Sequence, residues 1–268
     1  MRRLVLTSLT SMLLLTGMAG TAGAQVETLM YDHVHMAVPD PPKAAAWWQE
    51  HIGGEFVDDL KDRLLFGRTR IMFLRGNEKT QPSAGAAIDH LGFSFPDLDA
   101  KIKELEAAGA KMEGPARDVQ GLFKLAFAID PWGNRLELVQ DAELLGFHHV
   151  HLRALDPDAS YKWYLAQFGG ERMQLKGRID GIRYPGAPYV WVLITKGENR
   201  PSRGSSIDHI GWRAIKLDAK VTELKGKNIA METEQRPLKL PNGTIQFAYV
   251  VGPDGTRIEL VEREPHMK

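Results

Sequence analysis

The chain has 268 residues, enough for two ordinary domains or one large one. Its 34 basic and 34 acidic side chains balance, which excludes a general field that would recruit nucleic acid or an anionic membrane. Because the chain has no cysteine, disulfides, thiol catalysis and thiolate metal sites are excluded, and any metal must be held by histidine and carboxylate.

Residues 1–24 have the layout of a cleaved signal peptide. Two arginines precede a short apolar run, and the small residues "AGA" stand directly before Gln25. A retained membrane anchor is the alternative, but the apolar run is interrupted by Thr and Ser and is short for a spanning helix. We therefore expect a periplasmic or secreted protein that begins near Gln25 and has no membrane contact after cleavage.

Behind this leader the chain alternates strand and helix patterns. The strand that holds His33 is followed by a helix that starts at a proline pair and is closed by Gly53-Gly54. A second strand is followed by a helix that Asp97 caps and Gly109 ends. Short strands and glycine-rich turns follow each helix, so each unit is predicted to be βαβββ.

The second half of the chain repeats the first, which gives four such modules starting near residues 29, 87, 146 and 206. The predicted domains are residues 25–142, with modules 1 and 2, and residues 143–268, with modules 3 and 4. The matching segments are "YDHVHMAVPD" with "FHHVHLRALD", "DHLGFSF" with "DHIGWRA", and "GNRLELV" with "GTRIELV".

These motifs resemble the vicinal oxygen chelate superfamily over nearly all of the mature chain. That superfamily includes glyoxalase I, bleomycin-resistance proteins and extradiol dioxygenases. The resemblance implies an α+β fold in which four βαβββ modules form two paired, cup-shaped mixed sheets with helices outside. It also implies a metal site within the cup.

Strand parity indicates which side chains share the cup, because alternate residues of a strand point to opposite faces. In each motif the histidines and the glutamate lie on the small or polar face, and apolar residues occupy the other. Two histidines and one carboxylate suit a divalent metal such as Fe, Mn or Zn. The predicted metal ligands are His33, His90, Glu137, His149, His209 and Glu259.

The first ligand of each His-Val-His pair is chosen by register. His33 and His149 precede the aspartate before the next helix by the same number of residues as His90 does. His35 and His151 point to the same face and are predicted to be catalytic proton carriers, neighbours that orient the ligands, or competing ligands. His51, His148 and His266 fall outside this pattern and are predicted to have no functional role.

The resemblance to glyoxalase I would require a carboxylate from the last strand of every module. The corresponding residues are Met72 in module 1 and Trp191 or Val192 in module 3, so a four-ligand site is disfavoured. Part of the extradiol dioxygenase signature is present around Tyr249, which the resemblance assigns to substrate oxygens. The upstream histidine of that signature is missing.

We expect a metal-dependent lyase, isomerase or extradiol-type dioxygenase that acts on a small substrate with vicinal oxygens. A metal-free protein that sequesters a small molecule, as bleomycin-resistance proteins do, is the alternative. Either one or both halves could be active, and Tyr249 favours the second. Pairing of modules in sequence order would combine His33, His90 and Glu137, and His149, His209 and Glu259, whereas exchanged pairing would redistribute the histidines.

Overall fold

The computed structural model describes residues 26–57, 60–186 and 188–264. The predicted signal peptide and His266 lie outside these ranges. Within them, no helix combines the length and the hydropathy needed to cross a membrane.

The order of elements recurs as one strand, one helix and several strands. Module 1 contains β1 (Met30–Val38), α1 (Pro41–His51), β2 (Glu55–Val57), β3 (Leu60–Phe66) and β4 (Thr69–Arg75). Module 2 contains β5 (Ile88–Ser94), α2 (Leu98–Ala107), β6 (Lys111–Met112), β7 (Arg117–Asp118), β8 (Lys124–Ile129) and β9 (Arg135–Gln140). Module 3 contains β10 (Gly146–Ala154), α3 (Pro157–Phe168), β11 (Glu171–Leu175), β12 (Ile179–Pro185) and β13 (Tyr189–Lys196). Module 4 contains β14 (Ile207–Arg213), α4 (Leu217–Gly226), β15 (Met231–Leu240), β16 (Gly243–Val251), the 3-10 turn η1 (Pro253–Gly255) and β17 (Arg257–Arg263).

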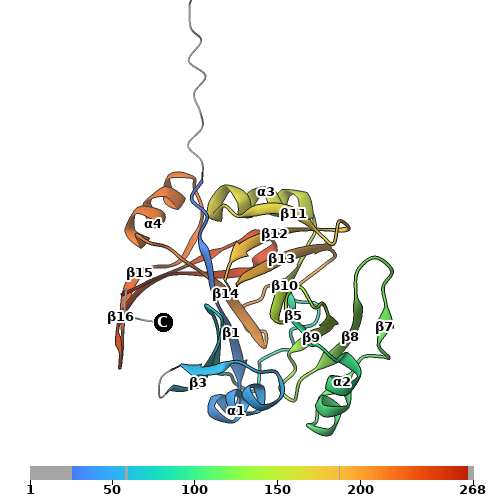
Figure 1. The fold of residues 1–268 in the computed structure, drawn as a ribbon. Coiled ribbons are helices and arrows are strands. Elements are labelled where there is room, and N and C mark those ends of the chain that lie inside the picture. The colour runs from blue at the N-terminus through green and yellow to red at the C-terminus, as the bar shows by residue number, and fades with distance from the viewer. Residues whose placement is uncertain (1–25, 58–59, 187, 265–268) are drawn as a thin grey trace, which may run out of the picture.

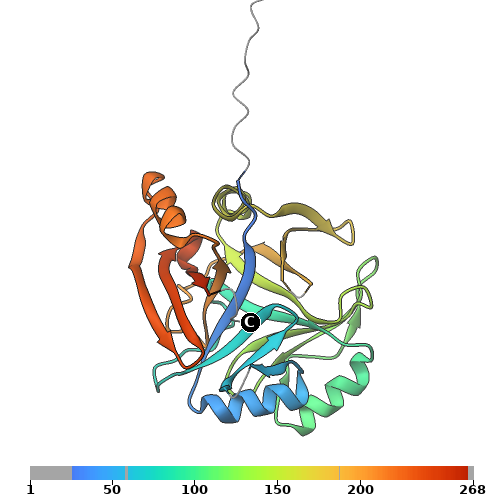
Figure 2. The ribbon, with the colours of Figure 1, turned by 60° about the vertical axis from the view of Figure 1, so that its left-hand side comes forward.

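The strands form two curved mixed sheets with the helices outside, as Figures 1 and 2 show, and the expected α+β architecture is confirmed. The first sheet has the order β15-β16-β17-β14-β1-β4-β3-β2 and therefore joins module 1 to module 4. The second sheet has the order β11-β12-β13-β10-β5-β9-β8-β6, with β7 beside β8, and joins module 3 to module 2.

Of the two pairings that the sequence leaves open, the structure has the exchanged one. Strand β1 pairs antiparallel with β14, and β10 pairs antiparallel with β5. Each predicted domain, 25–142 and 143–268, thus contributes strands to both sheets, so neither sheet follows that division of the chain. The physical reason lies in the connections, because the short segment 141–145 brings β10 alongside module 2 and leaves modules 1 and 4 to complete the other sheet.

The two linkers within the halves lie side by side. Gln81 bridges to Ser205, and Ala86 bridges to Arg200. The Arg200 guanidinium also donates to the Ala84 carbonyl over 2.9 Å. These contacts join the linker between modules 1 and 2 to the linker between modules 3 and 4.

Helix starts follow one local rule in three modules. Asp97, as predicted, accepts a hydrogen bond from the Ala100 amide over 3.0 Å, and the aspartates before α1 and α3 cap in the same way. Gly53 and Gly109, the predicted helix ends, have φ of +112° and +93°, which glycine adopts without strain.

Strand parity separates core from cup as predicted. The apolar alternate residues Val34, Met36 and Val38 of β1 are buried in a single core that spans both sheets and includes Trp48 of α1 and Trp212 of β14. The opposite face of each sheet is concave and carries the histidines.

Helix α4 lacks the cap that the other helices have, and this yields a stability prediction. Lys216 has φ −133° and ψ 96°, nearly the backbone of Asp97, but makes no side-chain cap. We expect Lys216→Asp to raise the free energy of unfolding by about 0.5–1 kcal/mol. Lys216→Ala is the control for removal of the lysine, and denaturant melts of both variants decide; equal stability of the two would contradict the prediction.

Candidate metal centres

The six predicted ligands form two clusters, each built across a module exchange. The His33 centre consists of His33, His35, His209 and Glu259, and the His90 centre of His90, Glu137, His149 and His151. Within each centre the candidate ligand atoms lie within 4.8 Å of one another. Both sets contain the residues that the sequence predicts, in the exchanged grouping.

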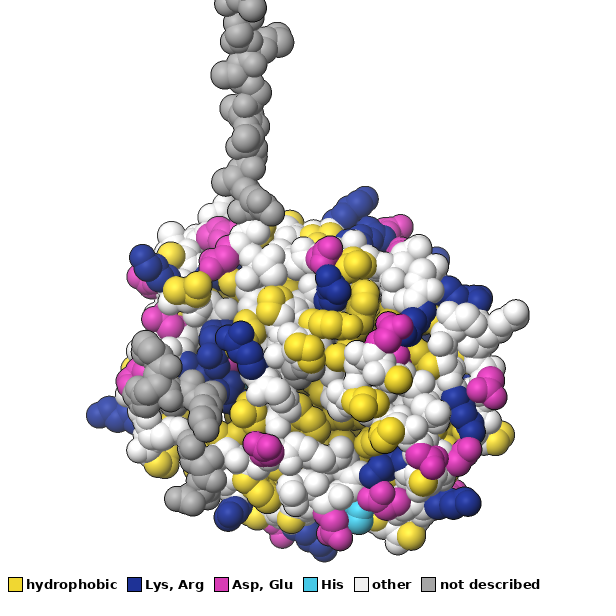
Figure 3. All heavy atoms as spheres, in the orientation of Figure 1, with side chains coloured by type: hydrophobic (Ala, Val, Ile, Leu, Met, Phe, Trp, Pro, Cys, Tyr) yellow, Lys and Arg dark blue, Asp and Glu magenta, His cyan; other side chains and the backbone are white. Residues whose placement is uncertain are grey.

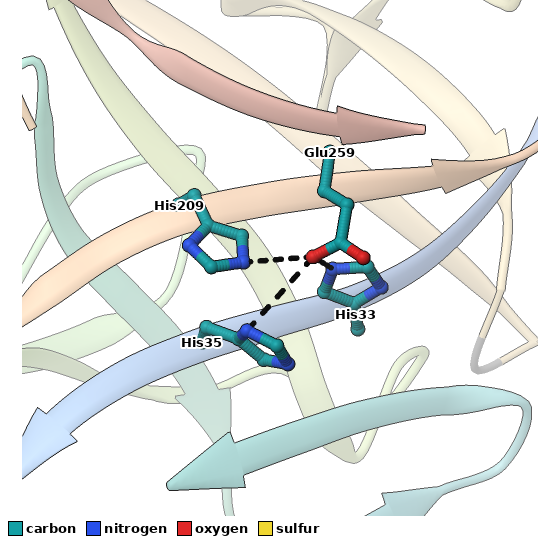
Figure 4. A group of neighbouring side chains, drawn as sticks. All are labelled: His33, His35, His209 and Glu259. Carbon is teal, nitrogen blue, oxygen red and sulfur yellow. Dashed lines mark hydrogen bonds and ion pairs between the residues drawn. The ribbon is translucent and has the colours of Figure 1, made fainter. Parts of the chain in front are cut away.

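In the His33 centre three side chains converge on one carboxylate oxygen. His33 Nε2 and His209 Nε2 lie 3.3 Å and 3.0 Å from Glu259 Oε2. His35 Nδ1 lies 4.0 Å from the same oxygen. Figure 4 shows His33 and His35 projecting from one strand, with His209 and Glu259 approaching from two others.

Carboxylates behind the histidines fix their orientation, and the sequence analysis missed them. His33 Nδ1 donates to Asp32 over 2.9 Å, and His209 Nδ1 donates to Asp208 over 2.6 Å. Neighbours on a strand normally point to opposite faces, but Asp32 and Asp208 are the extra residues of β-bulges where β1 and β14 pair. A bulge re-aims a side chain, which lets each aspartate reach its neighbouring histidine. The dipeptide Asp-His in three of the four motifs is the signal that could have revealed this.

The His90 centre has the same core geometry. His90 Nε2 and His149 Nε2 lie 3.1 Å and 3.2 Å from Glu137 Oε2. His90 Nδ1 donates to Asp89 over 2.7 Å. Each centre therefore presents two imidazoles and one carboxylate toward a common point.

His148 does not face away from His149, although strand parity predicts that it would. His148 occupies the bulge position of β10, where Asp32 stands in β1. Its Nδ1 lies 2.9 Å from His149 Nδ1, and its Nε2 lies 3.4 Å from Asp141 Oδ2. The bulge again explains the error, because parity alone places His148 on the core face.

Two glycines make room for the ligand rings. A Cβ at Gly211 would lie 2.2 Å from the His33 ring, and one at Gly92 would lie 2.0 Å from the His149 ring. Gly211 pairs with His33 across β14 and β1, and Gly92 pairs with His149 across β5 and β10. Glycine at these positions is therefore required by the exchanged pairing itself.

The three predicted catalytic residues lie beside the ligands. Tyr249 donates to Glu259 over 2.8 Å, and its hydroxyl lies 3.2 Å from His209 Nε2. Both ring nitrogens of His35 are buried without a hydrogen-bond partner, whereas His151 Nε2 contacts the Thr195 hydroxyl. Phe127 replaces the tyrosine in the His90 centre and packs edge-on against His90.

Burial and neighbouring charges shift the pKa values of the side chains in the His33 centre. Burial disfavours a charge on His33, but Glu259 and Asp32 outweigh it and raise its pKa. The same burial opposes ionisation of Glu259, yet His33 and His209 hold the pKa of its carboxyl well below the ordinary value. Burial, followed by the charges of His209 and His33, lowers the pKa of His35, which is therefore a neutral imidazole.

Three arginines surround Asp32. Arg213 Nε donates to Asp32 over 2.9 Å, Arg263 over 2.7 Å and Arg70 over 3.2 Å. These charges hold the pKa of the fully buried Asp32 well below its ordinary value, against the opposing effect of burial. The carboxylate behind His33 is thus kept ionised inside the protein, with more positive than negative charge around it.

No carboxylate of the last strands of modules 1 and 3 reaches these centres. Met72 stands opposite His35, as predicted, but the equivalent partner of His151 is Leu193, so the prediction of Trp191 or Val192 is wrong. Trp191 pairs with His149 instead. The length of the preceding turn, which sets the register of β13, cannot be read from alternation alone.

A cavity of about 210 Å³ opens over the His33 centre. His35, Tyr249 and Glu259 line its floor, and Arg63 lies on its wall. The other lining residues are mainly apolar, from β4, β15 and β16, and include Met72, Leu74, Leu238, Leu240, Ile245 and Phe247.

Both clusters fit a divalent ion. His33 Nε2 and His149 Nε2 are buried and have no hydrogen-bond partner, although each faces a glutamate oxygen. Because Asp32 accepts the proton of His33 Nδ1, the neutral form of His33 aims the lone pair of Nε2 at the carboxylate, an arrangement that a cation between them would stabilise. Two histidines and a glutamate suit Fe(II), Mn or Zn.

Comparisons with known proteins agree with this geometry. Residues 33–139 match the family model of a glyoxalase-like domain. Glyoxalase I from Zea mays has a similar structure, with a TM-score of 0.67 at 20% sequence identity over 88% of this chain and 92% of that chain. A predicted dioxygenase from Bacillus subtilis has a TM-score of 0.61 at 15% identity over 90% of this chain and 87% of that chain.

A search of curated proteins finds no match to this sequence. The two structural likenesses establish the fold, and the family model describes the segment that contains His33, His90 and Glu137. In this chain four βαβββ modules pair into two sheets, and each sheet carries one group of histidines with a glutamate. The glyoxalase-like match over residues 33–139 and the shared fold are consistent with the vicinal oxygen chelate superfamily.

Proposed function

We propose that the protein is an exported, metal-dependent enzyme that acts at the His33 centre on a small substrate with two neighbouring oxygens. The observation that carries this proposal is the convergence of His33, His209 and Tyr249 on Glu259 at the floor of the cavity. A divalent ion held there would supply Lewis acidity toward both substrate oxygens. The relatedness of the halves and cleavage of residues 1–24 are part of the same proposal.

His35 is the group best placed to move a proton. Its two ring nitrogens are unpaired, it lines the cavity, and its lowered pKa leaves it unprotonated and able to accept a proton near neutral pH. Tyr249 can donate its hydroxyl proton to a substrate oxygen in place of Glu259. Proton transfer at a carbon beside the bound oxygens, as in a lyase or isomerase, therefore uses groups that this chain supplies. Ring cleavage by an extradiol route is the other reaction class that this ligand set suits.

The cavity offers guanidinium groups to an acidic substrate once a bound ion offsets the charge of Glu259. Arg63 and Arg263 both line it, and the only acidic side chains on its wall and floor within the described ranges are Asp62 and Glu259. Arg63 donates to Asp62 through Nε over 2.7 Å and through Nη2 over 3.2 Å, which leaves its Nη1 protons for a ligand. A small molecule with a carboxylate next to an oxygen fits both this charge and the volume of the cavity.

A metal-free binding protein is the second candidate. One observation favours it, because a protonated His33 could pair with Glu259 without any ion. Metal content separates the two candidates. No bound metal after reconstitution with Fe, Mn and Zn would leave the cavity as a binding site for a small molecule.

The grouping of ligands gives a sharp test with double variants. We expect about two ions per chain in the reconstituted protein, measured by elemental mass spectrometry. The double variant His33→Ala/Glu259→Ala should keep one ion, because both substitutions lie in the His33 centre. The double variant His33→Ala/Glu137→Ala should lose both ions, because it removes one ligand from each centre. The reverse pattern would mean that the modules pair in sequence order.

The two glycines that make room for the histidine rings, Gly92 and Gly211, give a second test. Gly211→Ala should expel the ion of the His33 centre alone, because the new methyl group would overlap the imidazole ring. Gly92→Ala should do the same to the His90 centre. Gly226→Ala is the matched control, since nothing lies within 4 Å of its added Cβ. Full metal content in Gly211→Ala would contradict the packing argument.

The charge of the cavity is tested with oxalate, a dianion with vicinal oxygens. Arg63→Gln should weaken oxalate binding to the metal-loaded protein about tenfold, through loss of charge-assisted hydrogen bonds. Arg68→Gln removes the same charge from an exposed position in the β3–β4 turn and should leave the affinity unchanged. Calorimetric titration of both variants decides, and equal affinities would rule out Arg63 as an anchor.

A further inference from the structure

The two metal centres have the same types of ligand, two histidines and one glutamate. They differ in the neighbouring groups that could bind substrate or move a proton. The hydroxyl of Tyr249 faces Glu259, whereas the edge of Phe127 faces the His90 centre. Both ring nitrogens of His35 are buried without a hydrogen-bond partner, whereas in His151 only Nδ1 is, because Nε2 contacts the Thr195 hydroxyl. The position of Thr195 is occupied by Leu74 in module 1, since each follows the partner of the second histidine by two residues.

The residues behind the two histidine ligands also differ as a set. Asp32, which orients His33, corresponds to His148, which orients His149. The three arginines that surround Asp32 are replaced in the second centre as well. In strand register Arg70, Arg213 and Arg263 correspond to Trp191, Ser94 and Asp141. The excess of positive charge behind the first centre is therefore missing behind the second, where His148 faces Asp141 instead.

Apolar side chains occupy the concave face of the second sheet. They form one packed cluster with contributions from modules 2 and 3 and include Phe123, Leu125, Val139, Leu144, Leu175, Trp191 and Leu193. Figure 3 shows hydrophobic side chains gathered over the second sheet, whereas Lys and Arg side chains gather over the first sheet between β16 and β1. On the first sheet the equivalent residues Phe247, Met72 and Tyr249 line the cavity.

The ligands of the second centre are nevertheless intact and joined across the module exchange. His149 comes from β10, whereas His90 and Glu137 come from β5 and β9. The Glu137 side chain keeps 10% of its surface exposed, so that an ion can enter. An ion there would bridge the antiparallel β10–β5 pair, which joins modules 3 and 2.

We propose that the two centres have separate roles, in which the His33 centre takes substrate and the His90 centre holds a structural ion that fastens module 2 to module 3. This division rests on the proposed function of the His33 centre. A structural ion is one whose removal lowers stability but that accepts no ligand with vicinal oxygens. Three features separate the second centre from the first: an apolar cluster on the concave face, Phe127 in place of the tyrosine hydroxyl, and a Thr195 contact that engages Nε2 of His151.

The test uses Co(II), whose visible spectrum reports on its ligands, in variants that keep one centre each. Glu137→Ala leaves the His33 centre, and oxalate should change its spectrum with saturation. Glu259→Ala leaves the His90 centre, and oxalate should not change its spectrum at concentrations about 100-fold above that saturation point, which corresponds to about two decades of affinity. Co(II) should still raise the melting temperature of Glu259→Ala by several degrees over its metal-free form.

Each outcome has one reading. A saturable spectral change in Glu259→Ala at concentrations like those for Glu137→Ala would overturn the division of roles and make both centres substrate sites. No rise in melting temperature with Co(II) would overturn the structural role. No response to oxalate in Glu137→Ala would instead overturn the proposed function of the first centre. If a glutamate variant fails to fold, His149→Ala and His33→Ala leave the same single centres and give the same readings.

Discussion

The antiparallel pairing of the first strands of two modules is the constraint on which the rest of the structure depends. Where β1 meets β14, His33 is brought opposite Gly211, and its ring occupies the space that the glycine leaves. The bulges of the same pair turn Asp32 and Asp208 toward the histidines beside them. One strand pair thus supplies two ligands, room for a ring and the acceptors that fix both rings.

This constraint also explains why the modules exchange partners without loss of the site. Each centre takes one predicted ligand, a histidine, from module 1 or 3. It takes the other histidine and the glutamate from module 2 or 4. Modules 1 and 3 lack the carboxylate, with Met72 and Leu193 in its place, while modules 2 and 4 have it. Any pairing of an odd module with an even one therefore gives a complete ligand set, and the short segment 141–145 decides which pairing forms.

The two centres differ in the net charge of the buried side chains around them. Asp32 lies among three guanidinium groups, so the region behind His33 carries net positive charge. An anionic ligand in the adjacent cavity would be attracted by that charge in a medium of low dielectric constant. In the second sheet the same positions hold aromatic, hydroxyl, imidazole and carboxylate side chains, and apolar packing fills the concave face.

The sequence by itself determined the modules, the helix caps and the six residues predicted as ligands, because these depend on local rules: alternation along a strand, aspartate before a helix and glycine after it. Tertiary structure alone decided which module met which, and hence that His33 shares its centre with Glu259 rather than Glu137. Bulges decided the roles of Asp32 and His148, because an extra residue breaks the parity from which side-chain direction is read. The inequality of the centres also required the structure, since cavity and apolar cluster arise from residues far apart in the chain.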